Sequence, residues 1–108
     1  IRKEFETNLF IPGSTEGVNI ELEKALRLND FITMGELIAY DALNRNESCG
    51  GHFREEYQTE EGEAKRDDEN YFYVSCWEYQ GSDDVAPVLY KEPLVYEAIK
   101  VQTRNYKS

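Results

Sequence analysis

The stretch from residue 54 to residue 70, REEYQTEEGEAKRDDEN, divides the chain, because neither a helix pattern nor a strand pattern continues through it. It is dense in charge, nearly free of apolar residues and aperiodic, which is typical of a solvated, partly mobile loop. The residues before it have helical spacing, and those after it have strand spacing. A chain of 108 residues has room for one small core. We therefore predict a single α+β domain, with a helical part at about 1–50, a charged loop at about 54–70, and a hairpin and extended tail at about 71–108.

The helical part is predicted to contain two helices preceded by an N-terminal arm. The arm ends at a Pro12-Gly13-Ser14 turn and is either a frayed helix or extended. Asn19 is placed to cap the first helix, which Asn29-Asp30 is expected to interrupt. Apolar residues then recur every three or four positions, which predicts a second helix from about Phe31 to about Arg45, with Asp30 as its cap.

The second predicted helix has more apolar surface than a small chain can cover. One short helix and a two-stranded hairpin are too little for its stripe of Phe31, Met34, Leu37, Ile38 and Leu43. Gly35 lies in the same helix at a cost of about 1 kcal/mol relative to alanine, which close packing of another backbone would explain. For the isolated chain we expect a weak homodimer through Phe5, Leu9 and Phe10 of the arm and part of this helix, strengthened by salt.

The clearest strand is YFYVSCWEY, Tyr71 to Tyr79, which is rich in aromatic and β-branched residues. Its alternation places Phe72, Val74 and Cys76 on one face and Tyr73, Ser75 and Trp77 on the other, and we expect Cys76 to be buried. A turn at Gly81-Ser82-Asp83 and a second strand at Val88-Leu89-Tyr90 complete a β-hairpin. Pro87 and Pro93 bracket the second strand, which indicates an edge position.

The overall charge and the cysteine content limit the function classes. A formal net charge of -10 would repel nucleic acid and anionic lipid. Two cysteines, with no signal peptide and no long apolar run, favour a reducing cytoplasmic setting. The chain begins at Ile1 without an initiator methionine, as a domain cut from a longer protein would.

The stretch NESCGGHFREE, residues 46–56, gathers a thiol, an imidazole, a guanidinium and carboxylates around two glycines. A zinc site would combine Cys49 and His52 with Cys76 and a carboxylate, but His52 is the single histidine and the second close pair of ligands is missing. A Cys49–His52 nucleophile is a second alternative, although residues three apart in a glycine turn do not hold that geometry reliably.

A structural interpretation of this stretch accounts for more of its residues. It ends the long helix near Glu47-Ser48 and reverses the chain at Gly50-Gly51, with positive φ at one of the two glycines. His52 and Arg54 then fold back, so that their donors meet the last helix carbonyls or Glu47. We favour this interpretation over the metal and nucleophile alternatives.

Two sequence blocks, NRNESCGGHFREE and RDDEN, resemble the C-terminal end of the flavoprotein subunit of succinate dehydrogenase and fumarate reductase. L-aspartate oxidase, a relative of that family, shares the first block. Two positions depart from the family pattern, because Cys49 stands where an arginine is usual and Gly51 where alanine is common. The matching residues, which the resemblance implies form a structural or interface motif, are Arg45, Glu47, Ser48, Gly50, His52, Arg54, Arg66, Asp67, Asp68 and Asn70.

The resemblance also implies a function for the parent protein. That protein is an oxidoreductase that transfers electrons between succinate or fumarate and FAD, in electron transport and the tricarboxylic acid cycle. Flavin attachment and dicarboxylate binding lie upstream, and the sequence has no G-x-G-x-x-G fingerprint. No catalytic, cofactor-binding or metal residue is therefore expected in this chain, which is predicted to be inactive alone.

The expected partners follow from the same resemblance. They are the flavin-binding domain of the same subunit and, as a further candidate, the iron-sulfur subunit, in a complex at the cytoplasmic face of the inner membrane. The alternative is a stand-alone acidic module that binds a protein through its Tyr/Trp hairpin.

Overall fold

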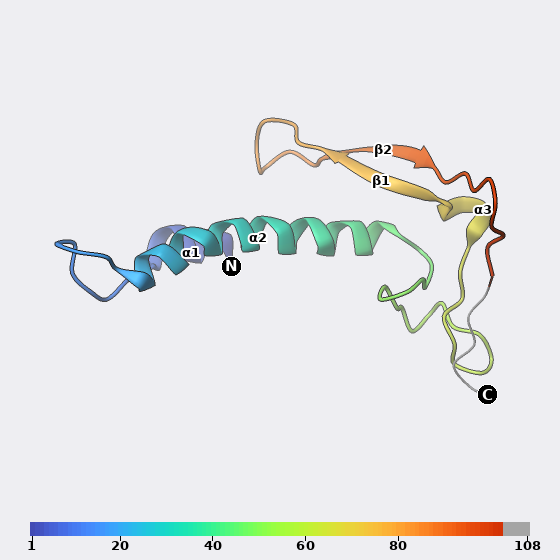
Figure 1. Ribbon diagram of the computed structural model, residues 1–108, viewed down its shortest axis with the longest axis horizontal. Coiled ribbons are helices and arrows are strands. Elements are labelled where there is room, and N and C mark those ends of the chain that lie inside the picture. The colour runs from blue at the N-terminus through green and yellow to red at the C-terminus, as the bar shows by residue number, and fades with distance from the viewer. Residues whose placement is uncertain (103–108) are drawn as a thin grey trace. The chain divides into compact units, whose positions relative to one another are not determined.

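The computed structural model describes residues 1–102 and divides into two compact units, Ile1–Leu43 and Asn44–Ser108. We call these the helical unit and the hairpin unit. The elements in chain order are α1 (Arg2–Asn8), α2 (Ile20–Asn44), α3 (Asp68–Tyr71), β1 (Tyr73–Glu78) and β2 (Val88–Pro93), as Figure 1 shows. The predicted α+β class, with helices followed by a hairpin, is confirmed. Residues 103–108 of the predicted tail lie outside the described residues.

The helical unit is a pair of helices joined by the turn at Pro12-Gly13-Ser14. The arm, for which the sequence left two conformations open, is helical over α1. Arg2, at the start of α1, donates from Nη2 to Glu36 Oε2 at 2.8 Å and to Thr33 Oγ1 at 3.2 Å. Both acceptors lie in the second half of α2, while the residues that follow α1 lie near the first half. The two helices therefore run antiparallel.

Asn19 fixes the start of α2, as predicted. Its Oδ1 accepts a hydrogen bond from the backbone N–H of Leu22 at 3.1 Å, which is N-cap geometry. Its Nδ2 donates to the carbonyl oxygen of Pro12 at 3.2 Å. Gly13 has φ of 118°, and a Cβ there would lie 2.5 Å from Asn19 Nδ2, so this turn requires glycine. One asparagine thus joins the turn to the helix.

The predicted interruption at Asn29-Asp30 is wrong, and so is the assignment of Asp30 as a cap, because α2 is one helix of 25 residues. Asn and Asp each cost only up to about 0.7 kcal/mol relative to alanine inside a helix, and no proline removes a hydrogen bond here. Both side chains are exposed to water. The helix therefore continues through these two weak helix formers. It ends at Asn44, slightly earlier than expected.

Most of the apolar stripe of α2 is exposed, as its width suggested, while Leu37 is half-buried. Phe31, Met34 and Ile38 are 65%, 53% and 64% exposed. The predicted close backbone at Gly35 is wrong for the part of the chain that the structure describes, because a Cβ there would have nothing within 4 Å. The glycine is left without a packing partner in residues 1–102.

The hairpin of the second unit is confirmed. Strands β1 and β2 are antiparallel and pair from Tyr73 with Pro93 to Glu78 with Val88. The alternation along β1 is also as predicted, but it is the face of Tyr73, Ser75 and Trp77 that is half-buried. The expected burial of Cys76 is therefore wrong, because its face of the hairpin is the solvent-exposed one.

The charged loop is more ordered than its composition suggested. An isolated bridge joins Gln58 to Ala64, with a hydrogen bond from Thr59 N to Glu63 O at 2.8 Å. At its end, α3 forms a short helix capped by Asp67, whose side chain accepts from Asn70 N. Having little apolar surface, the loop is organised by backbone and capping hydrogen bonds. The charged loop predicted at about 54–70 thus contains a bridge and, at its end, most of α3.

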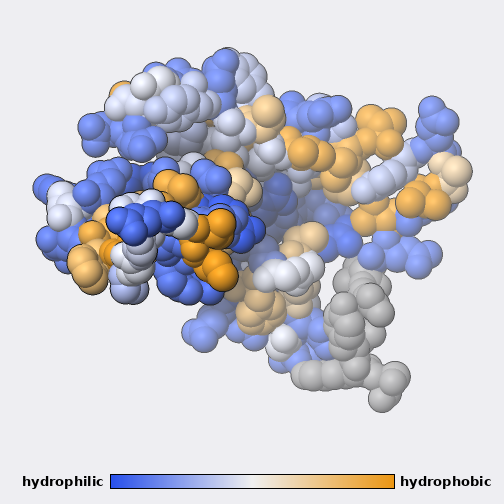
Figure 2. All heavy atoms as spheres, turned by 60° about the vertical axis from the view of Figure 1, so that its left-hand side comes forward, coloured by the Kyte–Doolittle hydropathy of each residue, from blue (hydrophilic) through white to orange (hydrophobic). Residues whose placement is uncertain are grey.

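The described part of this chain differs from an ordinary small domain in which side chains are buried. Within residues 1–102, no apolar side chain is buried, and the only buried residues are Glu47, 3% exposed, and Ser48, fully buried. Figure 2 shows hydrophobic residues in orange at the surface among hydrophilic ones in blue. A folded chain normally buries its apolar side chains. None of the helices in the described range is long and apolar enough to cross a bilayer.

Candidate functional site

The two buried residues hold together the two sequence blocks of the hairpin unit. Glu47 Oε2 accepts a hydrogen bond from the backbone N–H of Asp67 at 2.8 Å, twenty residues away. Next to it, Ser48 N donates to the carbonyl oxygen of Lys65 at 2.9 Å. The hydroxyl of Ser48 also accepts from Arg54 N at 2.8 Å and donates to Arg54 O at 3.2 Å. Two adjacent residues thus bind the first block to the second block, and Ser48 also binds Arg54 within the first block.

Arg45 links this centre to the hairpin. Its Nη1 lies 2.6 Å from Glu47 Oε1 in an ion pair whose side chains are 18% and 3% exposed. The guanidinium also donates to the carbonyl oxygens of Tyr71, at 3.3 Å, and Tyr73, at 3.4 Å. Leu94 N donates to Phe72 O at 3.1 Å, so Tyr73 and Pro93 are a non-hydrogen-bonded pair of the ladder. The carbonyl of Tyr73 therefore faces away from β2, and Arg45 is its donor.

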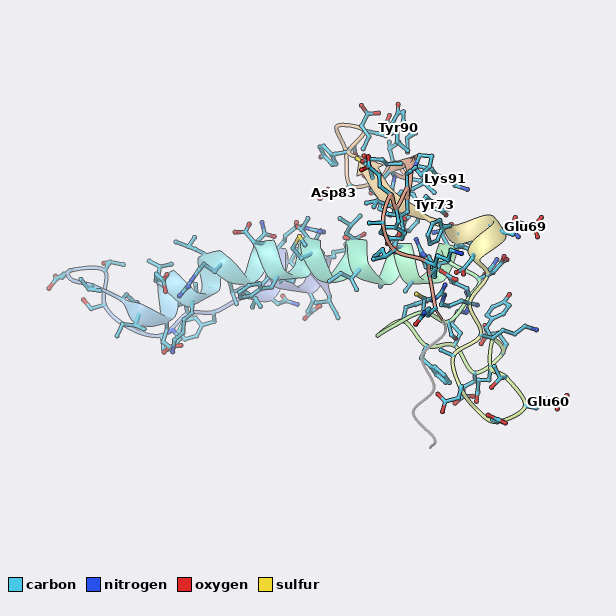
Figure 3. The ribbon with its side chains drawn as sticks, turned by 45° about the vertical axis from the view of Figure 1, so that its right-hand side comes forward. Glu60, Glu69, Tyr73, Asp83, Tyr90 and Lys91 are labelled. Atoms are coloured by element: carbon cyan, nitrogen blue, oxygen red, sulfur yellow. The ribbon has the colours of Figure 1, made fainter. Side chains whose placement is uncertain are left out.

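Aromatic rings surround the same guanidinium. Arg45 Cζ lies 5.6 Å from the ring centroid of Tyr71 and 5.3 Å from that of Tyr73, and Lys91 Nζ lies 4.5 Å from the Tyr73 ring. Figure 3 labels Tyr73 and Lys91, which lie close together on the hairpin. These are cation–π distances. Sequence spacing carries no signal for these tyrosines and Lys91, because Tyr71 and Tyr73 are 26 and 28 positions from Arg45 and meet it only in the fold.

The glycine pair forms a tight turn, as predicted. Cys49 and His52 exchange two backbone hydrogen bonds, of 2.8 and 3.1 Å. Gly50 has φ of 58°, while Gly51 is not among the described glycines with positive φ. Positive φ at the first central position only is the pattern of a type II′ turn, which prefers glycine there. The prediction that one of the two glycines has positive φ is confirmed.

His52 and Arg54 fold back on the end of α2, also as predicted. His52 Nε2 lies 3.0 Å from the carbonyl oxygen of Arg45, which can only accept, so the imidazole donates from Nε2. Arg54 Nη1 donates to the same carbonyl at 3.3 Å and to Asn46 Oδ1 at 2.9 Å. The carbonyl just beyond the last turn of α2 is thereby satisfied by two side chains.

The guanidinium of Arg54 also binds a carboxylate. Arg54 Nε donates to Glu56 Oε1 at 2.7 Å. Hydrogen bonds from its own backbone amide and from Arg54 lower the pKa of Glu56 below its ordinary value. Glu56 is fully exposed, so water screens this pair and its contribution to stability is small.

The second block is a capped turn next to a two-point ion pair. Arg66 donates from Nε to Asp68 Oδ1 at 2.8 Å and from Nη2 to Asp68 Oδ2, and these hydrogen bonds raise the pKa of Arg66. Asp67 caps α3, and Asn70 Nδ2 returns a hydrogen bond to Asp67 Oδ2 at 2.9 Å. Arg66 also reaches Gln102 O at 3.1 Å. All ten residues of the two-block motif therefore lie in one unit.

The arrangement differs from the metal and nucleophile alternatives. Cys49 and Cys76 are both exposed free thiols. No group of three or more His, Cys, Asp or Glu side chains within residues 1–102 is placed to hold a metal ion. The imidazole of His52 uses Nε2 on a backbone carbonyl. The geometry is that of a hydrogen-bonded structural cluster.

The arginines of the described range are all engaged with carboxylates. A dinucleotide phosphate needs free backbone N–H groups at a glycine-rich turn or unpaired basic groups. Every arginine within the described range is within 4.0 Å of a carboxylate, and these pairs are Arg2–Glu36, Arg27–Glu23, Arg45–Glu47, Arg54–Glu56 and Arg66–Asp68. The arginines therefore offer no unpaired guanidinium to a phosphate.

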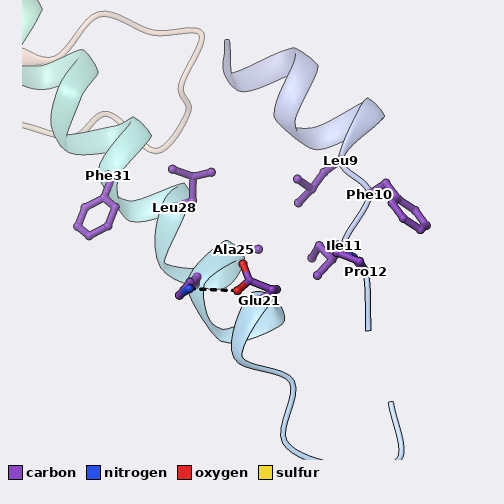
Figure 4. A pocket seen from close by; sticks show the side chains of 9 residues that line it. Leu9, Phe10, Ile11, Pro12, Glu21, Ala25, Leu28 and Phe31 are labelled. Carbon is purple, nitrogen blue, oxygen red and sulfur yellow. Dashed lines mark hydrogen bonds and ion pairs between the residues drawn. The ribbon is translucent and has the colours of Figure 1, made fainter. Parts of the chain in front are cut away.

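The helical unit contains an open apolar groove. Residues 9–12 form one wall, and Ala25, Leu28 and Phe31 of α2 form the other, around a volume of about 400 Å³ (Figure 4). Lys24 and Glu21 form an ion pair of 3.0 Å at its edge. Its walls carry no convergent polar groups that would orient a small ligand.

Comparison with known proteins identifies the family. No solved structure gives a significant match to the chain. A family model described as fumarate reductase flavoprotein C-term matches residues 1–106, which is nearly the whole chain and includes both sequence blocks. The resemblance inferred from those blocks is confirmed, and the chain belongs to the family of fumarate reductase flavoprotein C-terminal domains.

Proposed function

We propose that this chain is the C-terminal structural domain of the flavoprotein subunit of a succinate dehydrogenase or fumarate reductase and packs against the flavin-binding domain of that subunit. The parent protein transfers electrons between succinate or fumarate and FAD. The chain itself supplies no catalytic group. Its matching family, a C-terminal region of a flavoprotein, supports this role.

One observation carries the proposal: within residues 1–102 no apolar side chain is buried. Burying a large apolar side chain is worth about 1.5–3 kcal/mol, so a chain that buries none lacks its main source of stability. The missing burial has to come from another surface, and the flavin-binding domain is the nearest candidate. The iron-sulfur subunit is a further candidate partner, in a complex at the cytoplasmic face of the inner membrane.

The two-block motif has a defined part in this proposal. Glu47 and Ser48 make a joint between the first block and residues 65–67 through hydrogen bonds within the hairpin unit. We assign the ten residues of the two-block motif to this structural role. Arg45 extends the joint to the first residue of β1.

The experiment uses the complete flavoprotein subunit and a version that lacks residues 1–108. We expect the truncated subunit to lose FAD or thermal stability, because the surface of the flavin-binding domain on which the chain packs becomes exposed to solvent. A truncated subunit that retains both would contradict the proposal and favour the alternative, an independent acidic interaction module.

The isolated chain provides a second test. It is expected to be colourless, to leave succinate-dependent dye reduction at background, and to associate weakly through Phe5, Leu9, Phe10 and part of α2. Because its net charge of -10 opposes association, the dimer should strengthen with salt. Yellow colour or dye reduction would overturn the assignment, and sedimentation as a monomer at every salt concentration would refute the dimer.

A further inference from the structure

The outer edge of β2 is defined by residues whose backbone groups point away from β1. Tyr73 and Pro93 form a non-hydrogen-bonded pair of the ladder. Hydrogen-bonded and non-hydrogen-bonded pairs alternate along an antiparallel ladder, so Leu89 and Lys91 also belong to non-hydrogen-bonded pairs. The outer edge of β2 is therefore formed by the backbone nitrogen and carbonyl groups of residues 89, 91 and 93.

This edge is open in the part of the chain that the structure describes. The sheet has two strands, and no hydrogen bond within residues 1–102 reaches the backbone of Leu89 or Lys91. Val88 and Tyr90, which are residue types enriched in strands, are 42% and 55% exposed. An open edge beside exposed apolar side chains is a template for a strand of another molecule.

Two prolines occupy outward positions of this edge. Pro93 ends β2, and Pro87, directly before β2, continues the same alternation. Proline has no N–H, so an added strand would find outward donors only at Leu89 and Lys91. A proline at an inward position, such as residue 90, would instead remove a hydrogen bond of the hairpin itself. The two prolines therefore weaken an added strand and leave the hairpin intact.

Lys91 places a charge between the two prolines. Its side chain is exposed, and its ammonium lies 4.5 Å from the ring centroid of Tyr73. If two copies paired antiparallel about a two-fold axis at Tyr90, Lys91 of each copy would lie opposite Leu89 of the other. The ammonium would then be pressed against an apolar side chain, and moving a charge out of water without a partner is unfavourable. In the same pairing Pro87 would lie opposite Pro93, where neither residue can donate.

We propose that Pro87, Lys91 and Pro93 close the outer edge of β2 to a second copy of the chain, so that the hairpin remains two-stranded. A second copy is the molecule to be excluded, because the edge matches itself under a two-fold rotation and every copy presents it. The inference goes beyond the proposed function and is independent of it, since it depends only on the register of the hairpin.

The first test removes all three residues from the edge. Pro87→Val, Lys91→Val and Pro93→Val are combined in the complete flavoprotein subunit, and self-association is measured by sedimentation equilibrium. We expect the association constant to rise about ten-fold or more, because the variant gains outward donors and loses the charge. Pro93→Val alone should raise it in the same direction, and it decides the test if the triple variant does not fold. An unchanged association constant would overturn the proposal.

Glu92→Val is the matched control for this test. Glu92 pairs with Val74 at a hydrogen-bonded position, so its N–H already points toward β1. The variant adds a β-branched side chain and removes a charge without adding an outward donor, and it should associate as the unaltered subunit does. Association as strong as that of the triple variant would mean that the face of the hairpin is protected instead of its edge, which would overturn the proposal.

The register of the association is tested by disulfide trapping. Tyr90→Cys is added to the triple variant after Cys49→Ser and Cys76→Ser remove the two exposed thiols. The two-fold pairing places residue 90 of both copies directly opposite each other at a non-hydrogen-bonded position, which suits a disulfide. We expect a linked dimer on oxidation, and about ten-fold less of it when the prolines and Lys91 are retained.

Glu92→Cys is the control for the register, because residue 92 of one copy would lie opposite residue 88 of the other. It should link much less than Tyr90→Cys does. Equal linking at the two positions would show that the copies do not meet in this register and would overturn the pairing on which the proposal depends.

Hydrogen exchange of the unaltered complete subunit tests the open edge itself. The amides of Val88, Tyr90 and Glu92 point into the ladder and should be protected, while those of Leu89 and Lys91 should exchange nearly as fast as unstructured backbone. Protection of Leu89 and Lys91 would mean that another segment already covers the edge, and it would overturn the proposal.

Discussion

The helical unit and the hairpin unit use opposite kinds of interaction. In the hairpin unit, the two buried residues are polar, and Glu47 and Ser48 each bond to segments far along the chain. In the helical unit, the long helix leaves Phe31, Met34 and Ile38 more than half exposed, and Arg2 joins the two helices by hydrogen bonds at the surface. The hairpin unit is thus specified from within, while the helical unit needs an apolar surface from elsewhere.

The difference follows from how the two kinds of interaction act. Hydrogen bonds are directional, so a few of them can fix a turn at its own residues without a large core. The hydrophobic effect is non-directional and scales with buried area, so a bare helix face gains little until a partner covers it. We therefore expect substitutions in the two units to change stability by different amounts.

The largest expected effect is at the centre of the hairpin unit. Glu47→Ala leaves the mostly buried guanidinium of Arg45 without its carboxylate and Asp67 N without an acceptor, so we expect a loss of about 3 kcal/mol in the free energy of unfolding. Denaturant unfolding of the complete subunit measures it. Glu60→Ala, exposed in the charged loop (Figure 3), is the control and should change stability by less than about 0.5 kcal/mol. Equal effects would mean that burial does not distinguish this site.

The turn beside that centre gives the next effect. Gly50→Val forces a branched side chain to positive φ and should cost about 1–2 kcal/mol, whereas Gly51→Val lacks that penalty. A Cβ at either glycine has open space within 4 Å, so the contrast isolates backbone strain from crowding. Thermal unfolding of both variants checks it, and the two midpoints must differ for the type II′ assignment to hold.

A smaller loss is expected in the helical unit from Asn19→Ala. The variant removes the cap hydrogen bond to Leu22 N and the bond to Pro12 O, at a cost of about 1 kcal/mol. Hydrogen exchange of the first turn of α2 should accelerate, while the turn at Gly50 should not change. Asn29→Ala, inside the same helix, should not accelerate it. An equal response from both variants would show that the cap is not what starts α2.

The smallest effect concerns one exposed side chain of the hairpin. The hydroxyl of Tyr90 donates to Glu78 Oε2 at 3.2 Å, and this hydrogen bond raises the pKa of Tyr90 above its ordinary value. Because the folded pKa is raised, the bond contributes below about pH 10 and is lost as the pH rises through the folded pKa. Glu78→Gln should lower the pKa of Tyr90, measured as the difference in absorbance titration from Tyr90→Phe. An unchanged titration would show that the bond does not form in solution.

The sequence indicated the parts whose cause is local. Asn19 caps a helix through its own side chain, and the Gly50-Gly51 pair allows a two-residue turn, so both follow from residue type. The fold-back of His52 and Arg54 is equally local, because it follows from the turn two to four residues earlier. These predictions are confirmed for that reason.

The parts that the sequence could not supply depend on distant neighbours. The charged loop had no apolar period to signal order, yet Glu47 and Ser48 organise its end through hydrogen bonds to Asp67 and Lys65. The break expected at Asn29-Asp30 is absent, because a weak local preference costs less than ending a helix.

By itself, the sequence determined that this chain is acidic, that it is α+β, that its turn lies at Gly50-Gly51 and that its two blocks belong to one family. These are properties of residue type and short-range spacing. The tertiary structure alone decided that Cys76 faces solvent, that Arg45 lies among tyrosines of the hairpin and that the buried centre is polar. The physical reason is that burial and strand register arise only when segments far apart in sequence meet, and a local pattern carries no record of which segments those are.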